Sequence, residues 1–385
     1  MYDVTSSLII DNSSSSLKCG LAKKRSPSYF HSCACDIRYL DDKKFEQNNK
    51  EKETPFTKKN DKVVNDLILG SQNKPFIEKG NIIDVECCGE TYKYIIEKKF
   101  EREAENIPIL ICDSLNTKEE SKKTLAEYMF EELKISVLAM VSQPVLSLFS
   151  VGMTSGLVVD SGYGHTQIAP IIEGYILKSK QISEAISGEY VDKELYRGLY
   201  KWKTKENIDD LIHSLKKISK GVSLDHESIS QPELVSAGSI DNIPEDLIEL
   251  PDGNMANIGF FSDTYSSIFF NKYQENNNVS KLCLKALHFS YQNIQRLLSE
   301  NILFVGGNSN IKNIKRRLVL EMEELEKQER VSNCIFRLVD NPWNPADNPF
   351  VGGCIITELA NANAYWITRT EYEENGADIL MKKLP

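Results

Sequence analysis

Two short apolar runs in this sequence each end in an aspartate that is followed by small or polar residues. The first lies in residues 8–20, "LIIDNSSSSLKCG", and the second in residues 155–177, "SGLVVDSGYGHTQIAPIIEGYIL". Each run predicts a buried β-strand, because such strands are short and rich in branched side chains. The small residues that follow predict a tight turn. This repeat of a strand, an aspartate and a turn limits the folds that the chain can adopt.

Three further segments extend this pattern. Residues 301–325 contain an apolar strand that ends in two glycines and a long helix that follows them. Residues 107–114, "IPILICDS", predict a buried parallel strand, and residues 118–133 predict an amphipathic helix directly after it. Repeated strand–turn units with intervening helices indicate an α/β protein with two related halves.

The aspartate-ended hairpins are candidates for a phosphate site. Glycine eases the turn after a strand in any α/β fold, so one such junction does not specify a ligand. Two facing hairpins would instead aim their backbone N–H groups at one polyphosphate, with Asp11 and Asp160 holding Mg²⁺ through its water molecules. The alternative for the first hairpin is an ordinary hydrogen-bonded turn over residues 13–16 that binds nothing.

Length, charge and cysteine content exclude several classes of protein. The 385 residues suit two domains or one bilobed domain, and a net charge of −10 argues against a nucleic-acid-binding surface. No apolar run approaches the roughly 20 residues of a membrane helix, so we expect an intracellular protein. The nine cysteines are expected to be reduced thiols. The pairs Cys33/Cys35 and Cys87/Cys88 lack zinc-type spacing.

Residues 142–177, "SQPVLSLFSVGMTSGLVVDSGYGHTQIAPIIEGYIL", resemble the central segment of actin and actin-related proteins. That family shares a bilobed ATPase fold with sugar kinases and Hsp70. The resemblance continues in order over nearly the whole chain, in residues 8–12, 105–114, 248–259, 301–318, 350–355 and 365–376. It implies an α/β bilobed fold with a central nucleotide cleft.

The resemblance also implies four subdomains. Subdomain 1 is expected to comprise residues 1–22, 80–150 and 350–385, and subdomain 2 residues 23–79 with a charged insertion. Subdomain 3 is expected over residues 151–190 and 260–349, and subdomain 4 over residues 191–259.

The first hairpin departs from the family at two positions. Asp11, Ser14 and Lys18 fit the family pattern, whereas Ser13 and Ser15 stand where the family has glycine. A serine Cβ crowds backbone that must approach phosphate, and it disfavours positive φ. The resemblance therefore implies an ATP or ADP site, with Mg²⁺, that holds its nucleotide less closely.

The second hairpin departs at the positions that serve hydrolysis in the family. Asp160, Gly162 and Gly164 keep the pattern, but Tyr163 stands in place of a second aspartate and Gln167 in place of a histidine. A phenol does not orient water or hydrated metal as a carboxylate does at neutral pH. Gln143 matches the glutamine that positions the attacking water. We expect ATP hydrolysis to be weak or absent.

The contacts to ribose and adenine are mixed. Lys217 replaces an acid of the family and Ile311 replaces an aromatic residue. The resemblance therefore implies weak or structural nucleotide occupancy, with an empty but folded site as the alternative. The positions that match the family around the ribose and adenine are Gly188, Lys216, Gly306 and Gly307, and Asn308 is a further expected cofactor-binding residue.

Residues 41–62, "DDKKFEQNNKEKETPFTKKNDK", predict an exposed charged insertion. They stand where actin carries a loop that docks into the next subunit, and burying these charges unpaired would be costly. A repeating filament subunit is therefore disfavoured. We expect a specialised subunit whose partners are actin-like subunits and other proteins of a multi-subunit complex.

The resemblance leaves two function classes open. The turn "DSGYG" and residues 259–278 resemble the actin-related protein at the pointed end of dynactin, which predicts a cytoplasmic, cytoskeletal capping scaffold. The tail "TRTEYEENG", residues 368–376, and the same turn favour a nuclear actin-related subunit of a chromatin-remodelling complex. A sugar-kinase-like phosphotransferase is disfavoured by the actin-type features "ELPDG" and "WITRTEY".

Overall fold

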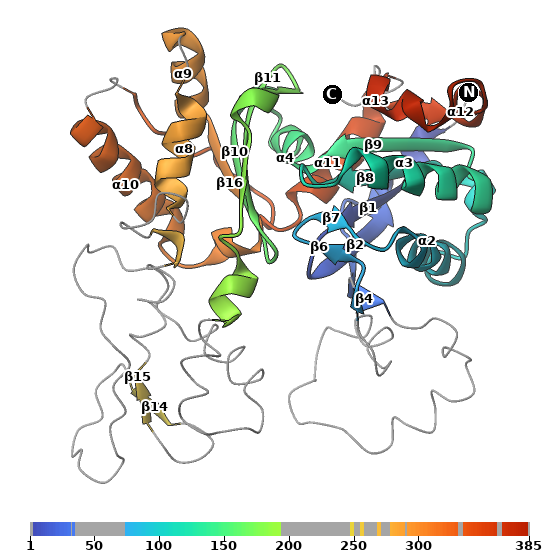
Figure 1. Ribbon diagram of the computed structural model, residues 1–385, viewed down its shortest axis with the longest axis horizontal. Helices are drawn as coiled ribbons and strands as arrows, with labels where there is room; N and C mark the ends of the chain where they lie inside the picture. The colour runs from blue at the N-terminus through green and yellow to red at the C-terminus, as the bar shows by residue number, and fades with distance from the viewer. Residues whose placement is uncertain are drawn as a thin grey trace. The chain divides into compact units, whose positions relative to one another are not determined.

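The computed structural model divides the chain into two compact units (Figure 1). Unit 1 comprises Met1–Thr154, Ile172–Ile176 and Asn341–Pro385, and unit 2 comprises Ser155–Ile171 and Leu177–Asp340. The structure describes residues 3–31, 33–34, 74–193, 247–249, 255–257, 268–270, 278–288, 291–329, 334–359 and 364–383. The predicted insertion over residues 41–62, together with Lys216 and Lys217, lies outside the described residues.

Unit 1 is built on a sheet with the strand order β17-β9-β8-β1-β2-β3. β1 pairs parallel with β8, and β8 pairs parallel with β9, whereas the β1–β2 and β2–β3 pairs are antiparallel. The buried parallel strand predicted over residues 107–114 is confirmed as β8. The bounds are β1 (Leu8–Asn12), β2 (Ser16–Leu21), β3 (Ser28–His31), β8 (Ile109–Asp113), β9 (Val137–Ser142) and β17 (Trp366–Thr368).

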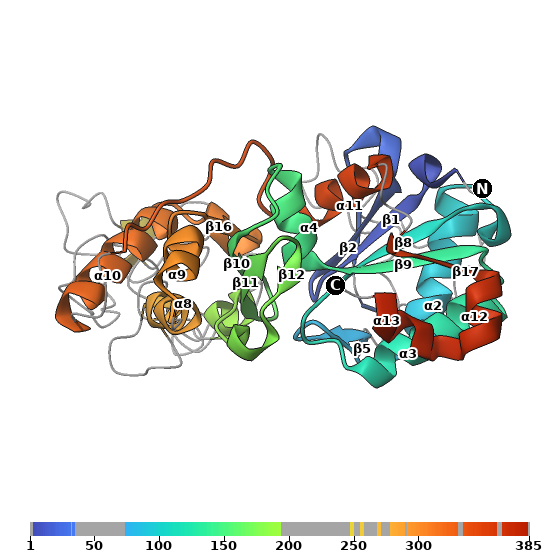
Figure 2. The ribbon, with the colours of Figure 1, turned by 90° about the horizontal axis from the view of Figure 1, so that it is seen from above.

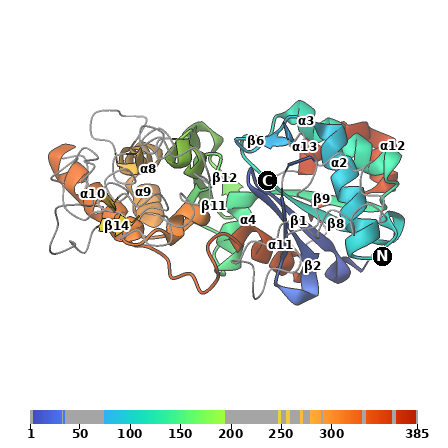
Figure 3. The same ribbon diagram turned by 90° about the horizontal axis from the view of Figure 1, so that it is seen from below.

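Helices cover both faces of this sheet (Figures 2 and 3). α2 (Val85–Tyr94) and α3 (Glu119–Glu127) lie over one face, and α4 (Gln143–Ser150) and α11 (Asn348–Glu358) over the other. Side chains alternate along a strand, so β1 sends Leu8 and Ile10 into the core below α2 and α3, while Ile9 faces Gly353 of α11. The helix predicted over residues 118–133 is confirmed as α3 and the π-turn η7 (Tyr128–Glu132).

The C-terminal helices pack on the same unit. α12 (Arg369–Asn375) begins with a capping box, in which Thr368 and Glu371 bond each other's backbone N–H groups. The Tyr372 ring stacks on Phe130 with ring centroids 4.4 Å apart. The other elements of unit 1 are β4 (Cys33–Ala34), β5 (Lys74–Pro75), β6 (Ile77–Glu78), β7 (Asn81–Ile82), β12 (Tyr175–Ile176), α13 (Ile379–Lys383), the π-turn η5 (Ile95–Lys99) and the 3₁₀ turns η1 (Val4–Ser6), η2 (Ala22–Lys24), η6 (Ala104–Asn106) and η12 (Gly376–Asp378).

Unit 2 repeats the central motif of unit 1. β10 (Gly156–Ser161) forms an antiparallel hairpin with β11 (Thr166–Ile172) and pairs parallel with β16 (Ile302–Val305). β13 (Ile182–Glu184) pairs with β11. In both hairpins the aspartate lies at the same point, because Asp11 is aligned with Cys112 of β8 and Asp160 with Val305 of β16. The prediction of two related halves is therefore confirmed.

Helices of unit 2 pack around a buried ion pair. Arg317 and Glu321 of α10 (Ile314–Glu329) lie 2.7 Å apart, and Asn278, the N-cap of α8 (Val279–Leu287), donates to Glu321 at 3.3 Å. The cationic side chain thus has a partner inside the core, as a buried charge requires. The other elements of unit 2 are α9 (Gln292–Ser299), β14 (Leu247–Glu249), β15 (Met255–Asn257) and the 3₁₀ turns η8 (Lys178–Lys180) and η10 (Gly307–Asn310).

Two absences apply to the described residues. Their cysteines form no disulfide, and Cys19, Cys88 and Cys112 are among those that are buried. None of their helices combines the length and the hydropathy needed to cross a lipid bilayer.

The crossing of α4 and α11 gives the first testable prediction. A Cβ on Gly352 would lie 1.8 Å from the Leu146 carbonyl oxygen, so Gly352→Ala should force the helices apart. We expect a loss at or above the upper end of the usual overpacking range, about 1–3 kcal/mol, measured by urea denaturation. Gly152→Ala is the control: φ is +75° but no atom lies within 4 Å, so only strain of about 1–2 kcal/mol is expected. Equal losses for both variants would contradict the close helix crossing.

Candidate functional site

The first hairpin buries a carboxylate beside a lysine and a glutamine. The β1–β2 register places Asp11 opposite Lys18, and the Lys18 ammonium lies 2.7 Å from Asp11 Oδ2. Gln143, at the start of α4, donates from Nε2 to Asp11 Oδ1 at 2.8 Å and also to the Asn12 carbonyl. Asp11 is fully buried. Lys18 and Gln143, which were predicted from two separate parts of the sequence, therefore meet at the Asp11 carboxylate.

The serine turn that follows Asp11 is not strained. None of the four serines at 13–16 has a positive φ, so the conformational objection to serine does not apply here. The Gly80 N–H donates to Ser14 Oγ at 3.2 Å, and the Gly80 carbonyl accepts from Thr117 Oγ1 at 3.0 Å. Ser15 is exposed, whereas Ser13 and Ser14 are partly buried. The turn is thus joined to the segment after β6, a contact that the sequence did not indicate.

The second hairpin holds its aspartate with an amide. Asp160 lies opposite Gln167 in the β10–β11 register, and Gln167 Nε2 donates to Asp160 Oδ2 at 2.9 Å. On the other face of the hairpin, the hydroxyls of Ser161 and Thr166 lie 2.8 Å apart and are buried. The position predicted to have lost a histidine therefore binds the aspartate directly.

The predicted glycines of unit 2 allow backbone to approach this hairpin. Gly306 has φ +86°, and a Cβ there would lie 2.3 Å from the Ser161 carbonyl oxygen and 2.6 Å from Asp160 Oδ1. No larger residue fits without displacing the hairpin. Asn308 Nδ2 donates to the Gly162 carbonyl at 2.6 Å and to Ser161 Oγ at 3.1 Å. The structure thus brings Gly306 and Asn308 to the aspartate-bearing hairpin.

A histidine that the sequence analysis did not single out lies on the same hairpin. His165 is partly buried, and its backbone carbonyl closes the turn by accepting from the Gly162 N–H at 3.0 Å. Burial lowers the pKa of the imidazole, while the Asp160 charge and a hydrogen bond with Gln167 oppose this effect. The available signal was proximity in the sequence, since His165 immediately precedes β11 and lies two positions before Gln167.

The two aspartates differ in how well they fit a magnesium-bound phosphate chain. Both are carboxylates of the kind that binds the water shell of Mg²⁺. Asp11 is fully buried, with its oxygens bound by Lys18 and Gln143, whereas Asp160 is only partly buried and fits this role better. Gly307 leaves room for a ligand, because no heavy atom lies within 4 Å of where its Cβ would be. Tyr163 is the departure: its aromatic side chain, 40% exposed, stands at the tip of the second hairpin.

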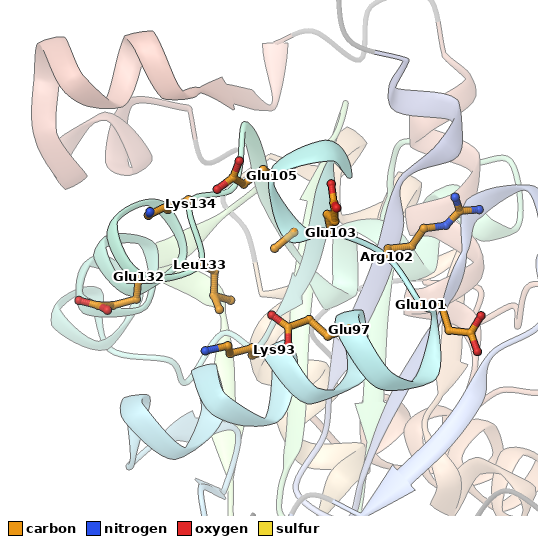
Figure 4. A pocket seen from close by; sticks show the side chains of 10 residues that line it. Lys93, Glu97, Glu101, Arg102, Glu103, Glu105, Glu132, Leu133 and Lys134 are labelled. Carbon is orange, nitrogen blue, oxygen red and sulfur yellow. The ribbon is translucent and has the colours of Figure 1, made fainter.

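A separate groove of about 780 Å³ lies on unit 1 and contains none of the predicted site residues (Figure 4). The buried side chains of Ala104 and Leu133 contribute its apolar part. Its charged side chains are exposed to solvent and of both signs, as is usual on a protein surface, so they do not by themselves indicate a ligand. They are Lys93, Glu97, Glu101, Arg102, Glu103, Glu105, Glu132 and Lys134.

Comparison with known proteins accounts for the paired hairpins. The sequence profile described as "Actin" matches residues 2–385. This chain belongs to the actin family. Similar actin-family proteins include "Actin-related protein 4" of Arabidopsis thaliana, 28% identical over 319 residues that cover 72% of each chain. "Actin-related protein 4" of Oryza sativa subsp. indica is 24% identical over 445 residues, covering 100% of this chain and 99% of the relative.

A third relative is "Actin-like protein 9" of Rattus norvegicus, which is 25% identical over 315 residues, 80% of this chain and 73% of the relative. The predicted resemblance and the bilobed actin fold are thus confirmed, and the chain is a divergent actin-related protein. The division into four subdomains and the nucleotide contacts stay predictions.

The buried pair in this actin-family hairpin gives a second prediction. Lys18→Met removes the counter-charge of the fully buried Asp11, and breaking such a pair costs about 3–5 kcal/mol. The double variant Asp11→Asn/Lys18→Met leaves no charge behind, so it should recover most of that loss. Urea denaturation followed by circular dichroism measures both. If the double variant were as unstable as the single one, the loss would not come from an uncompensated charge at Asp11.

Proposed function

We propose that this actin-related protein is a structural, non-polymerising subunit of a heteromeric complex, which caps an actin-like filament at its pointed end as in dynactin. In this proposal the aspartate-bearing hairpins bind a Mg-nucleotide, ATP or ADP, which is held weakly and hydrolysed slowly or not at all. The protein then works in the cytoplasm, on the cytoskeleton. Its fold and its family are the established part, and the complex, the site and the compartment are proposed.

The observation that carries the slow-hydrolysis part of the proposal is the composition of the second hairpin. Tyr163 and Gln167 stand at the positions where the family carries groups that serve hydrolysis, and Gln167 is bound to Asp160 at 2.9 Å. Gln143, the predicted water-positioning residue, donates to both Asp11 and the Asn12 carbonyl. These amides support a site that holds its carboxylates in place rather than one that activates water.

The filament contact is proposed for the C-terminal segments of unit 1. Residues 364–383 are firmly anchored there: Arg369 donates to the carbonyls of Phe130 and Ile135, and β17 pairs with β9. At the end of α11, Leu359 keeps 51% of its surface exposed. A single exposed apolar side chain is ordinary on a protein surface, so Leu359 serves as the position at which the proposed contact is tested.

Sedimentation tests the capping proposal. The protein alone should stay in the supernatant under conditions that polymerise actin, and it should pellet substoichiometrically when preassembled actin filaments are present. Leu359→Ser should abolish this co-pelleting, whereas Leu320→Ser, which changes a 40% exposed leucine of unit 2, should retain it. Pelleting of the protein alone as long polymers would defeat the proposal.

The alternative is a nuclear actin-related subunit of a chromatin-remodelling complex, which the tail at residues 368–376 favours. A tagged pull-down analysed by mass spectrometry separates the two. Dynactin rod and shoulder proteins are the result expected here, and remodelling ATPase and histone-variant factors would support the alternative instead. Recovery of neither set would contradict both.

Hydrolysis gives a further prediction. At saturating Mg-ATP the purified protein should turn over very slowly, because general-base and water-orienting groups typically supply about 10²–10⁴-fold in rate. Tyr163→Asp/Gln167→His restores both family side chains and should raise the rate measured by phosphate release. Tyr291→Ala, which changes an exposed tyrosine outside the hairpin, is the control and should leave the rate unchanged. Fast turnover by the unmodified protein that Asp160→Ala abolishes would contradict this prediction. It would show that other groups, such as His165, orient and activate the attacking water.

A further inference from the structure

The tip of the β10–β11 hairpin is fixed in place by main-chain hydrogen bonds. Gly162 and His165 close the turn, which leaves Tyr163 and Gly164 as its two central residues. The N–H groups of Gly188 and Glu189 donate to the carbonyls of Gly162 and Tyr163 at 3.1 and 2.8 Å. Because the carbonyls of Gly162 and Tyr163 are bound in this way, the Tyr163 backbone has a defined position against residues 188–189.

The Tyr163 ring lies directly against Gly188. The ring atom Cδ2 is 3.3 Å from the point where a Cβ of residue 188 would be, and Asn308 Oδ1 is 3.2 Å from the same point. Gly188 is buried, whereas 40% of the Tyr163 surface is exposed. The glycine therefore gives the ring a backbone surface to rest on, and the ring covers that surface.

Asn308 completes this arrangement from a third segment. Its amide nitrogen bonds Ser161 and Gly162, so its amide oxygen is held beside Gly188. A small side chain or a carboxylate at position 163 would leave the space over Gly188 open, since neither has a ring to fill it. Asp160 and Gln167 lie opposite each other on β10 and β11, the two strands that the tip connects.

We propose that Tyr163 is a specificity-determining residue: its ring takes up the room over Gly188 that the sugar of a nucleotide needs, and it leaves the phosphate-binding part of the site open. This inference rests on the proposed nucleotide site, in which Gly188 belongs to the sugar end and Asp160 to the phosphate end. The preferred ligand class is then a magnesium-bound polyphosphate, and a nucleoside on that polyphosphate weakens binding rather than strengthening it. Specificity here comes from a steric obstacle.

Isothermal titration calorimetry with the full chain tests this, using Mg-ADP and Mg-pyrophosphate as probes. Tyr163→Ala should tighten Mg-ADP binding by about 10-fold or more, since a misfit of even one methylene in a pocket is worth roughly 10–200-fold. The same variant should leave Mg-pyrophosphate affinity within a factor of about two, because that probe has no sugar to clash. Tyr163→Phe keeps the ring and should match the unmodified protein with both probes.

Two controls make the outcome decisive. Tyr291→Ala removes a tyrosine of unit 2 that is 69% exposed, and it should change neither affinity. Thermal denaturation without ligand shows whether each variant is folded. If Mg-pyrophosphate binds but Tyr163→Ala leaves Mg-ADP affinity unchanged or lower, the inference is wrong and the phosphate site stands. If neither probe binds any folded variant, the nucleotide site and the inference both fail.

Discussion

Burial of the Asp11 carboxylate constrains the first half of this protein more than any other interaction. A fully buried carboxylate is tolerated only when it is paired and hydrogen-bonded, and here both needs are met by Lys18 and Gln143. The lysine reaches Asp11 only in the observed β1–β2 register, and the glutamine only because α4 begins directly after β9. The contacts of this one carboxylate therefore link the β1–β2 hairpin, the neighbouring parallel strands and the first turn of α4.

The second hairpin uses the same geometry with a different charge balance. The cross-strand position opposite Asp11 holds a lysine, whereas the position opposite Asp160 holds the neutral Gln167. A cation opposite a buried carboxylate cancels its charge, but an amide only satisfies its hydrogen bonds. The negative charge of Asp160 is therefore less compensated within its own hairpin than that of Asp11. In the proposed site, this makes Asp160 the aspartate better suited to a hydrated metal.

Much of this architecture could be predicted from the sequence. The strands around both aspartates, β8 and the helix that follows it were predictable because their apolar periodicity is strong and local. The joining of Ser14 to Gly80 was not, since it links residues 66 positions apart and no local pattern marks it. The expectation that serine would be conformationally unfavourable in the first turn was wrong for a related reason: φ depends on the whole turn, and none of the four serines takes a positive φ. The predicted crowding of a phosphate by the serine Cβ atoms stays a prediction. His165 was not predictable from the resemblance, because the family's histidine matches position 167, two residues further on.

In the proposed function, each of the two aspartate-bearing hairpins binds the phosphates of a magnesium nucleotide. Hydrogen–deuterium exchange on the full chain, with and without Mg-ADP at saturating concentration, tests this most directly, because backbone N–H groups that bind phosphate exchange more slowly. We expect the backbone N–H groups of the turn at residues 13–16 and of the turn at residues 162–165 to become protected from exchange together, at the same Mg-ADP concentration. Protection of one turn without the other, or of neither, would contradict it.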